Sequence, residues 1–262
     1  MELTLHFAFR MLTANVYESM PEVVVRQAGM HAKGEDLMTS TADTNHSTIA
    51  ERVARFQQEM AGQLPQDVAD TFGAEQARLR DGGVPSGVAA TGTPMPDGQL
   101  LDVRGEPTTL AESIGGRGAV VVLYRGAWCP YCNLTLRAYQ EHLVPLLAQR
   151  DVALVAISPQ RPDGSLSSQQ MNALSFTVLS DPGNQVAAGL GVLTAPSEDS
   201  QAAQRRLGLE LREANADGTY GLPMPTVTIV DRAGTIRWID VHPDYTTRTE
   251  VADIVEALNC LK

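Results

Sequence analysis

Two cysteines separated by two residues carry the strongest chemical signal in this sequence of 262 residues. Cys129 and Cys132 follow an apolar stretch of strand character, residues 119–124, and precede a stretch with leucines at helical spacing. Pro130 between them favours the first helical position, where its missing N–H would be unpaired anyway. Cys129 is then the helix N-cap, and Cys132 lies one turn later on the same face. Because unpaired N–H groups and the helix dipole favour a thiolate there, the pair predicts redox-active sulfur.

Other roles for such a pair need residues that this chain does not place beside it. A zinc site normally needs a second Cys or His pair, whereas the third cysteine is Cys260 and the five histidines are scattered. Haem attachment needs His after the second cysteine, where this chain has Asn133. We therefore expect no metal and no cofactor, and a pair of buried structural thiols stays open as an alternative.

The bulk composition narrows the classes of partner. Twenty Lys and Arg stand against 31 Asp and Glu, a formal net charge of −11 that disfavours nucleic acid and anionic membranes. Three cysteines are too few for a disulfide scaffold and fit a reducing compartment. No apolar run reaches the ~20 residues of a membrane span, and the N-terminus lacks a signal-peptide pattern. We expect a cytoplasmic protein.

The order of patterns along the chain predicts three regions. Residues 1–46 show weak periodicity and are expected to form a poorly ordered extension. Residues 47–83 are expected to form a helical preface, which opens with a capping box from Thr48 to Glu51. After a linker rich in Gly and Pro, residues 94–262 are expected to form the main domain.

The main domain alternates strand and helix patterns and ends in a hairpin and a helix. This order predicts an α/β fold, in which helices flank a mixed sheet and the preface adds an N-terminal helical extension. Pro145 predicts a kink or an early break in the helix that follows the cysteines. The charged stretch Glu198–Ala216 is expected to be a helical surface insertion. The expected strands are 119–124, 151–158, 176–179, 226–230 and 235–239, with a last helix up to Leu261.

Five motifs carry a resemblance to a known family: YRGAWCPYCN at 124–133, VAISP at 155–159, LSDP at 179–182, MPT at 224–226 and DRAG at 231–234. With them, the chain from about Pro94 to Leu261 resembles the peroxiredoxin-like branch of the thioredoxin superfamily, also labelled alkyl hydroperoxide reductase/thiol-specific antioxidant. The resemblance implies a thioredoxin-like mixed sheet and an antioxidant oxidoreductase.

The resemblance also implies roles for single residues. Cys129 would be the thiol that attacks the peroxide, and Cys132 the resolving thiol that closes an intramolecular disulfide. Pro225 matches the cis-proline that faces the cysteines in this superfamily. The candidate substrate-binding residues are Trp128, Pro130, Tyr131, Met224 and Pro225.

Two positions depart from the family pattern. Typical peroxiredoxins carry Thr three residues before the attacking cysteine and Pro four residues before that Thr. Here Gly126 and Val122 hold those positions. We hypothesise that Arg125 replaces part of the role of Thr, because it can donate to the peroxide oxygens and favour the thiolate. Arg248, before the last helix, also resembles a family residue, but the sequence assigns it no role.

Three functions remain open on these residues. The first is a thiol peroxidase, and the second is a thiol–disulfide reductase of thioredoxin or glutaredoxin type. The third is a redox-switched binding module, which the preface and the 198–216 insertion would support. Thioredoxin, glutaredoxin or glutathione would act as reductant, and a homodimer is expected from the resemblance. Cys260 is expected to be an exposed thiol at a fraying helix end.

Overall fold

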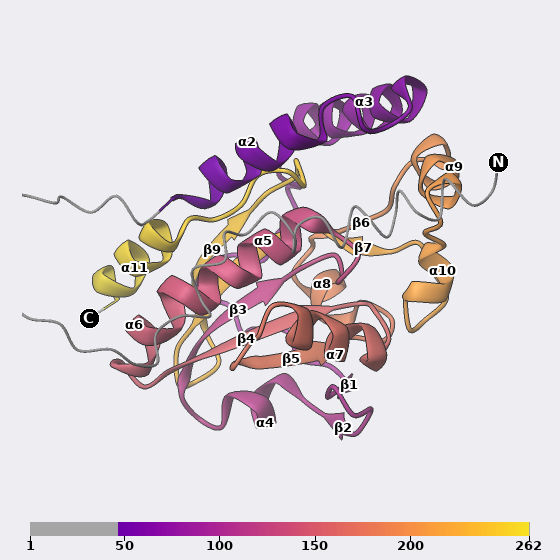
Figure 1. The fold of residues 1–262 in the computed structure, drawn as a ribbon. Coiled ribbons are helices and arrows are strands. Elements are labelled where there is room, and N and C mark those ends of the chain that lie inside the picture. Colours follow the sequence, from indigo (N-terminus) through magenta and orange to yellow (C-terminus); the bar gives the residue numbers. More distant parts are fainter. Residues whose placement is uncertain (1–46, 262) are drawn as a thin grey trace, which may run out of the picture.

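A seven-stranded mixed sheet forms the centre of the protein (Figure 1). The computed structural model describes residues 47–261, so the predicted extension 1–46 lies outside the described residues. The strand order is β2-β1-β5-β4-β3-β8-β9, in which β5, β4 and β3 are parallel and the other neighbours pair antiparallel. The strands are β1 Leu100–Leu101, β2 Pro107–Thr108, β3 Gly118–Leu123, β4 Val152–Ser158, β5 Thr177–Ser180, β8 Thr226–Val230 and β9 Ile236–Val241. A separate pair joins β6 Leu193–Thr194 to β7 Leu222–Pro223.

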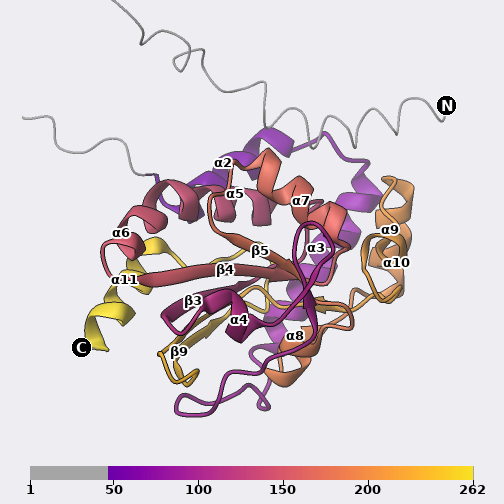
Figure 2. The same cartoon turned by 90° about the horizontal axis from the view of Figure 1, so that it is seen from below.

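Helices cover both faces of this sheet, as predicted (Figure 2). The face that carries the cysteines lies under α5 and α11, while α4 and α8 pack on the opposite face. The helices are α2 Ile49–Met60, α3 Gln66–Gly82, α4 Leu110–Ile114, α5 Pro130–Ala138, α6 Val144–Ala148, α7 Pro162–Met171, α8 Gln185–Gly189, α9 Glu198–Arg206, α10 Leu211–Ala214 and α11 Val251–Cys260.

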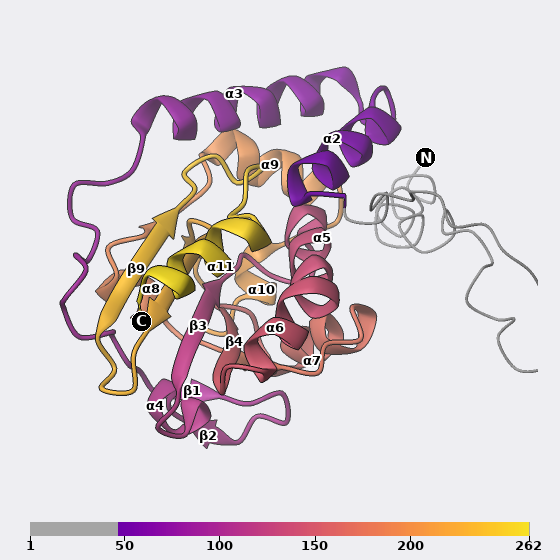
Figure 3. The same cartoon turned by 90° about the vertical axis from the view of Figure 1, so that its left-hand side faces the viewer.

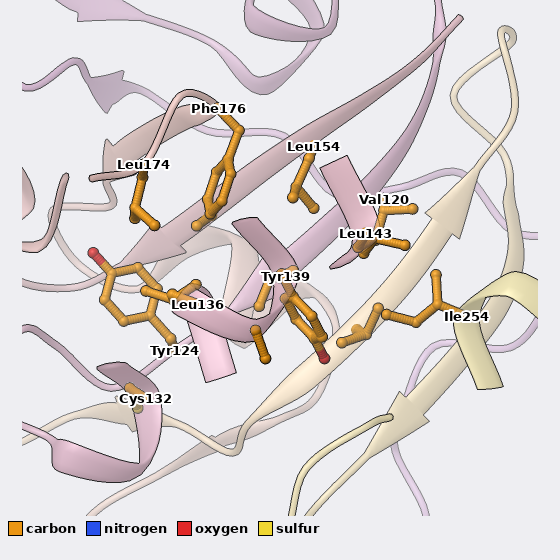
Figure 4. Close-up of a cluster of buried hydrophobic side chains, with 14 of the residues drawn as sticks. Val120, Tyr124, Cys132, Leu136, Tyr139, Leu143, Leu154, Leu174, Phe176 and Ile254 are labelled. Carbon is orange, nitrogen blue, oxygen red and sulfur yellow. The ribbon is translucent and has the colours of Figure 1, made fainter. Parts of the chain in front are cut away.

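Strand β3 is buried on both faces, and this burial explains why its sequence is a continuous apolar run. Its side chains alternate between two buried clusters, with Val120 and Val122 on the cysteine face and Val121 on the other. On the cysteine face, Leu136 and Tyr139 pack over the sheet with no exposed area (Figure 4). The strand therefore anchors the N-terminus of α5, where the cysteines lie.

The helix after the cysteines bends through a π-helical turn, Tyr139–Leu143, before it continues as α6. Pro145 stands at the start of α6, and its missing N–H removes one regular helical hydrogen bond there. Regular α-helical hydrogen bonding is thus interrupted just before Pro145, in the form of a π turn. Tyr139, the first residue of this turn, is buried in the core. Its hydroxyl donates a hydrogen bond of 2.7 Å to the Thr249 carbonyl.

The two preface helices lie along one side of the main domain (Figure 3). The predicted capping box is present, with the Thr48 hydroxyl and the Glu51 carboxylate exchanging hydrogen bonds with backbone N–H groups. Helix α2 packs on α5 and buries Ile49 and Val53 in the core of the cysteine face, while its buried Phe56 packs edge-on against Tyr131. The Glu250 carboxylate accepts hydrogen bonds from the N–H groups of Ile49 and Ala50, at 2.9 and 2.8 Å. A carboxylate at a helix N-terminus is stabilising, so α2 is fixed to the start of α11.

One sequence expectation about the helices needs correction. The stretch Glu198–Ala216 is helical, but it is not only a surface insertion, because Ala203 and Leu207 pack against Val68 of α3. Charged residues interrupt the apolar face of α9, so the sequence pattern did not indicate that this helix packs against α3. Residues Pro107–Thr108 form the edge strand β2, and α4 begins after the capping residue Thr109.

Candidate active site

Both cysteines occupy the positions that the sequence predicts. Cys129 is the N-cap of α5, Pro130 is its first residue, and Cys132 lies in the first turn. Both are free thiols, and each side chain is 1% exposed. Cys132 lies at the edge of the apolar core, near Tyr124 and Leu136 (Figure 4).

A pocket of about 180 Å³ opens over Cys129, whereas Cys132 is not among the residues that line it. Helix α5 forms one wall, and residues of α2, α3, α7 and the α9 region form the others. The lining residues are Phe56, Met60, Leu64, Phe72, Gln76, Arg125, Trp128, Cys129, Pro130, Tyr131, Asn133, Arg137, Met171, Asn172, Gln204, Leu207, Leu209 and Tyr245. Most of them are apolar or aromatic, so Cys129 faces an apolar chamber.

Arg125 brings a positive charge into this chamber. Its guanidinium carbon lies 4.0 Å from the ring centroid of Tyr245 and 5.1 Å from that of Trp128. The side chain is 7% exposed, and no described carboxylate lies within 4 Å of it. Aromatic faces thus hold the cation by cation–π contact and leave its N–H donors available for a ligand.

Gly126 explains the first departure from the family pattern. Its φ of +150° is unfavourable for other residues, and a Cβ there would lie 2.5 Å from Trp128 Nε1. The same Cβ would lie 3.1 Å from Gln160 Oε1, which accepts a hydrogen bond from Ala127 N–H at 2.8 Å. A Thr at this position therefore does not fit under the Trp128 indole.

Arg248 completes the surroundings of the two thiols. Its Nη2 lies 3.3 Å from Cys132 Sγ and 4.0 Å from Cys129 Sγ. Its Nη1 donates to the carbonyl oxygens of Tyr245 and Thr247, which hold the other end of the guanidinium. The sequence assigned Arg248 no role, and the structure places it against the cysteine pair.

The two thiols have opposite electrostatic surroundings. Burial raises the pKa of Cys129 well above its usual value, and the hydrogen bond that Cys129 donates to Cys132 raises it further. Burial also opposes a charge on Cys132. However, the Cys129 donor, the Arg248 charge and the Arg125 backbone N–H together hold the Cys132 pKa well below its usual value. Of the two positions, the surroundings of Cys132 therefore favour a thiolate more than those of Cys129 do.

The remaining predicted site residues lie apart from the Cys129 pocket. Pro225 lies beside Cys132 and Arg248 in a small cavity behind the pair, and Met224 belongs to the core of the opposite face. No peptide bond in residues 47–261 is cis, so the expected cis bond before Pro225 is wrong. The chain runs extended from β7 into β8, and the Pro225 carbonyl accepts a hydrogen bond from His242 N–H.

Buried polar atoms without partners also lie at the chamber. Within the described part of the chain, Gln204 Oε1 and Trp128 Nε1 are buried and make no hydrogen bond. Both residues line the pocket.

Residues 47–261 contain neither a metal cluster nor a membrane-spanning helix. No group of three or more His, Cys, Asp or Glu in that range could hold a metal ion. None of the described helices combines the length and apolar character that crossing a bilayer requires. Cys260 lies exposed at the end of α11, as predicted.

Comparison with known proteins decides the family. Residues 91–239, more than half of the chain, match the sequence profile of the AhpC/TSA family. The chain belongs to the AhpC/TSA family. Membership places it among thiol-dependent peroxidases and oxidoreductases, and the predicted resemblance is confirmed. A search of curated proteins finds no significant match.

Solved structures support the thioredoxin-like fold of this AhpC/TSA member. Peroxidoxin BcpB from Mycobacterium tuberculosis matches with a TM-score of 0.50 and 19% identity, over 66% of this chain and 97% of that one. A peroxiredoxin-like protein from Aquifex aeolicus matches with a TM-score of 0.50 and 15% identity, over 67% and 89% of the two chains. The family segment includes both cysteines, but α2, α3 and Arg248 lie outside it.

Proposed function

We propose that this AhpC/TSA protein is a thiol peroxidase, in which Cys129 attacks an organic hydroperoxide and Cys132 resolves the product. The observation that carries the proposal is that the two sulfurs differ in their position relative to the pocket. Cys129 opens onto the pocket, and Cys132 stands behind it, one helical turn away. A substrate in the pocket therefore meets Cys129 first, and Cys132 is in place for the second step.

The chemistry follows from this order. The Cys129 sulfur attacks the terminal oxygen of the hydroperoxide, the O–O bond breaks, and the products are an alcohol and a sulfenic acid. Cys132 then attacks the Cys129 sulfur and releases water as the disulfide forms. An external thiol, from thioredoxin, glutaredoxin or glutathione, would return the pair to its reduced form.

The chemistry of the chamber supports an organic rather than an inorganic peroxide. A cavity of about 150 Å³ lined by apolar side chains is large enough for benzene, and this pocket measures about 180 Å³. Phe72, Leu207 and Tyr131 offer an apolar surface that hydrogen peroxide cannot use. Arg125 can donate to the peroxide oxygens from the same chamber.

Disulfide reduction is the second candidate, and burial limits its substrates. Each cysteine is 1% exposed, so the disulfide of a folded protein cannot reach Cys129 in this conformation. A small organic disulfide, in contrast, fits the size of the pocket that Cys129 lines. The reductase reading therefore requires a small-molecule substrate.

Turnover assays with a series of oxidants test the proposal. Reduced protein is supplied with excess thiol, and consumption of cumene hydroperoxide, tert-butyl hydroperoxide, hydrogen peroxide and a small aromatic disulfide is compared. The expected result is the highest kcat/KM with cumene hydroperoxide and complete loss in Cys129→Ser. Turnover of the disulfide alone would overturn the peroxidase proposal in favour of the reductase.

A further inference from the structure

Arg125 is a buried cation with no opposite charge against it. The residue is 7% exposed, and no carboxylate of residues 47–261 lies within 4 Å of its guanidinium. The rings of Tyr245 and Trp128 face it, with centroids 4.0 and 5.1 Å from the guanidinium carbon. A cation removed from water is costly unless an opposite charge or an acceptor compensates it, and aromatic faces do so only in part.

The acidic residue in the neighbourhood already has partners. Glu75 lines a small cavity that Arg125 also lines. Its carboxylate forms an ion pair with Arg78 at 2.8 Å and accepts a hydrogen bond from Ser197 N–H at 3.3 Å. These contacts direct Glu75 to α3 and to the segment before α9, so the opposite charge for Arg125 must come from a ligand.

The pocket over Cys129 is both apolar and positively charged. Its volume is about 180 Å³, and most of its lining residues are apolar or aromatic. Arg125 and Arg137 are among these residues, and none of the described lining residues is Asp or Glu. The whole chain has a formal net charge of −11, so a pocket lined by cations alone stands out from the rest of the molecule. Such a pocket attracts an anion that has an apolar body.

A carboxylate is the anion that Arg125 fits best. The guanidinium presents its N–H donors in a planar fork that matches the two oxygens of a carboxylate. A phosphate monoester would bring a charge of about −1.5 to −2, whereas the neighbours of Arg125 are aromatic rings that supply no second positive charge. A guanidinium has five N–H donors, so two can bind a carboxylate while another remains for the peroxide oxygens.

We propose that Arg125 is a carboxylate-binding subsite, and that the oxidant of this protein is an organic hydroperoxide with an apolar body and a carboxylate group. The proposal rests on the peroxidase function above and names its substrate class. The carboxylate binds Arg125, the apolar body lies against Phe72 and Leu207, and the hydroperoxide group lies at Cys129. The carboxylate takes no part in the redox step, which is the one given above.

Binding of an inert analogue tests the subsite without any peroxide. 4-Isopropylbenzoate has the carboxylate and the apolar body but no hydroperoxide group, and 4-isopropylbenzamide is a neutral analogue of nearly the same size. Titration calorimetry with the reduced full-length protein measures both dissociation constants. Because hydrogen bonds to a charged group are strong, the benzoate should bind at least about tenfold more tightly than the amide. Equal affinities, or tighter binding of the amide, would overturn the proposal.

Variants of single arginines test which residue binds the carboxylate. Arg125→Gln should abolish the preference for the benzoate, and the ratio of the two affinities is the readout because general damage to the pocket would lower both. Arg125→Lys should retain part of the preference, since it keeps the charge and loses the planar fork. Arg232→Gln, at an exposed arginine paired with Asp151, is the matched control and should keep the full preference. A preference lost in Arg137→Gln but kept in Arg125→Gln would contradict the assignment.

Turnover of matched hydroperoxides tests whether the carboxylate belongs to the oxidant. The 4-carboxy derivative of cumene hydroperoxide is compared with its methyl ester, which keeps the apolar body and removes the charge. We expect kcat/KM for the acid to exceed that for the ester at least about tenfold in the wild type, and this preference to disappear in Arg125→Gln. Equal rates for the acid and the ester, with a preference only for glutathione over its ethyl ester as reductant, would show that the oxidant assignment is wrong.

The two assays separate two kinds of failure. If the benzoate binds through Arg125 but no hydroperoxide oxidises Cys129, the peroxidase function is wrong and the carboxylate subsite stands. If the acid and the ester are reduced equally and the benzoate binds no better than the amide, the peroxidase function stands and the subsite is wrong.

Discussion

The ring of Tyr245 lies 4.0 Å from the guanidinium carbon of Arg125 and covers one side of that cation beside the cysteine pocket. Trp128 contacts the same guanidinium from 5.1 Å. The Tyr245 hydroxyl accepts a hydrogen bond from Gln76 of α3, so the preface helices help to hold the ring. Arg125 is thus fixed by aromatic rings rather than by a carboxylate, and its charge remains available to the thiol and the substrate.

Removal of the Tyr245 ring should release Arg125. A buried cation–π contact contributes roughly 2 kcal/mol, so we expect Tyr245→Leu to lower kcat/KM for cumene hydroperoxide about tenfold. Tyr245→Phe keeps the ring and should retain most of the activity. Steady-state kinetics of both variants provide the measurement. Equal losses in Leu and Phe variants would assign the effect to the hydroxyl instead.

Gly126 should tolerate no side chain. Its positive φ and the 2.5 Å approach of a Cβ to Trp128 Nε1 both oppose substitution. We expect Gly126→Ala to lower the free energy of unfolding by about 1–3 kcal/mol, since strained backbone and forced packing each cost of this order. Urea unfolding followed by circular dichroism measures the change.

Restoration of the family Thr at position 126 gives the sharper comparison. We expect Gly126→Thr to displace Trp128 and to lower peroxidase activity, although typical peroxiredoxins use Thr there. The fluorescence maximum of Trp128, measured in a Trp238→Phe background, should move to longer wavelength. An increase in activity would show that Thr fits and that the indole does not exclude it.

The chamber should select substrates by their apolar part. Phe72 of α3 lines it and lies outside the family segment. Because a lost apolar contact in a binding pocket costs roughly 1–3 kcal/mol, Phe72→Ala should lower kcat/KM for cumene hydroperoxide at least about tenfold. For hydrogen peroxide the change should be less than about twofold on the same grounds. Leu146→Ala, at an exposed residue of α6, is the control. Equal losses with both peroxides would mean that the chamber does not select.

The stability of the reduced protein should depend on the ionisation of Cys132. The pKa of Cys132 is held below its unfolded value, so its thiolate contributes stability above the unfolded pKa, roughly 8.5 for a free thiol. That contribution is lost as the pH falls through the folded pKa. We therefore expect the difference in unfolding free energy between wild type and Cys132→Ser to widen as the pH rises from 5 towards about 8.5. A difference that stays constant with pH would contradict a thiolate at Cys132.

The sequence predicted those parts of the fold that local patterns determine. The continuous apolar run of β3, the capping box at Thr48 and the N-cap position of Cys129 all follow from neighbours within one or two helical turns. Pro130 and the apolar stretch before it were sufficient to place the cysteines. The mixed sheet followed from the order of such local patterns.

The rest of the site depends on contacts between distant segments. Arg248 lies 116 residues from Cys132 along the chain, and nothing in its neighbouring residues indicates a sulfur partner. The sequence favoured a thiolate at Cys129 because of the helix N-terminus, whereas Arg248, which the fold brings to Cys132, lowers the pKa of Cys132. The pocket wall that α3 and the α9 region form could not be predicted for the same reason, because these two helices meet only in the folded protein.

Single-turnover oxidation of the reduced protein tests the central claim, attack by Cys129 on an organic hydroperoxide. Stopped-flow fluorescence follows Trp128, which neighbours Cys129, after mixing with cumene hydroperoxide in a Trp238→Phe background. We expect fast oxidation to a disulfide in the parent protein and none in Cys129→Ser. In Cys132→Ser we expect slower oxidation that stops at a sulfenic acid, which a dimedone adduct on Cys129 would identify. Oxidation no faster than that of a free thiol, or oxidation that survives in Cys129→Ser, would contradict the claim.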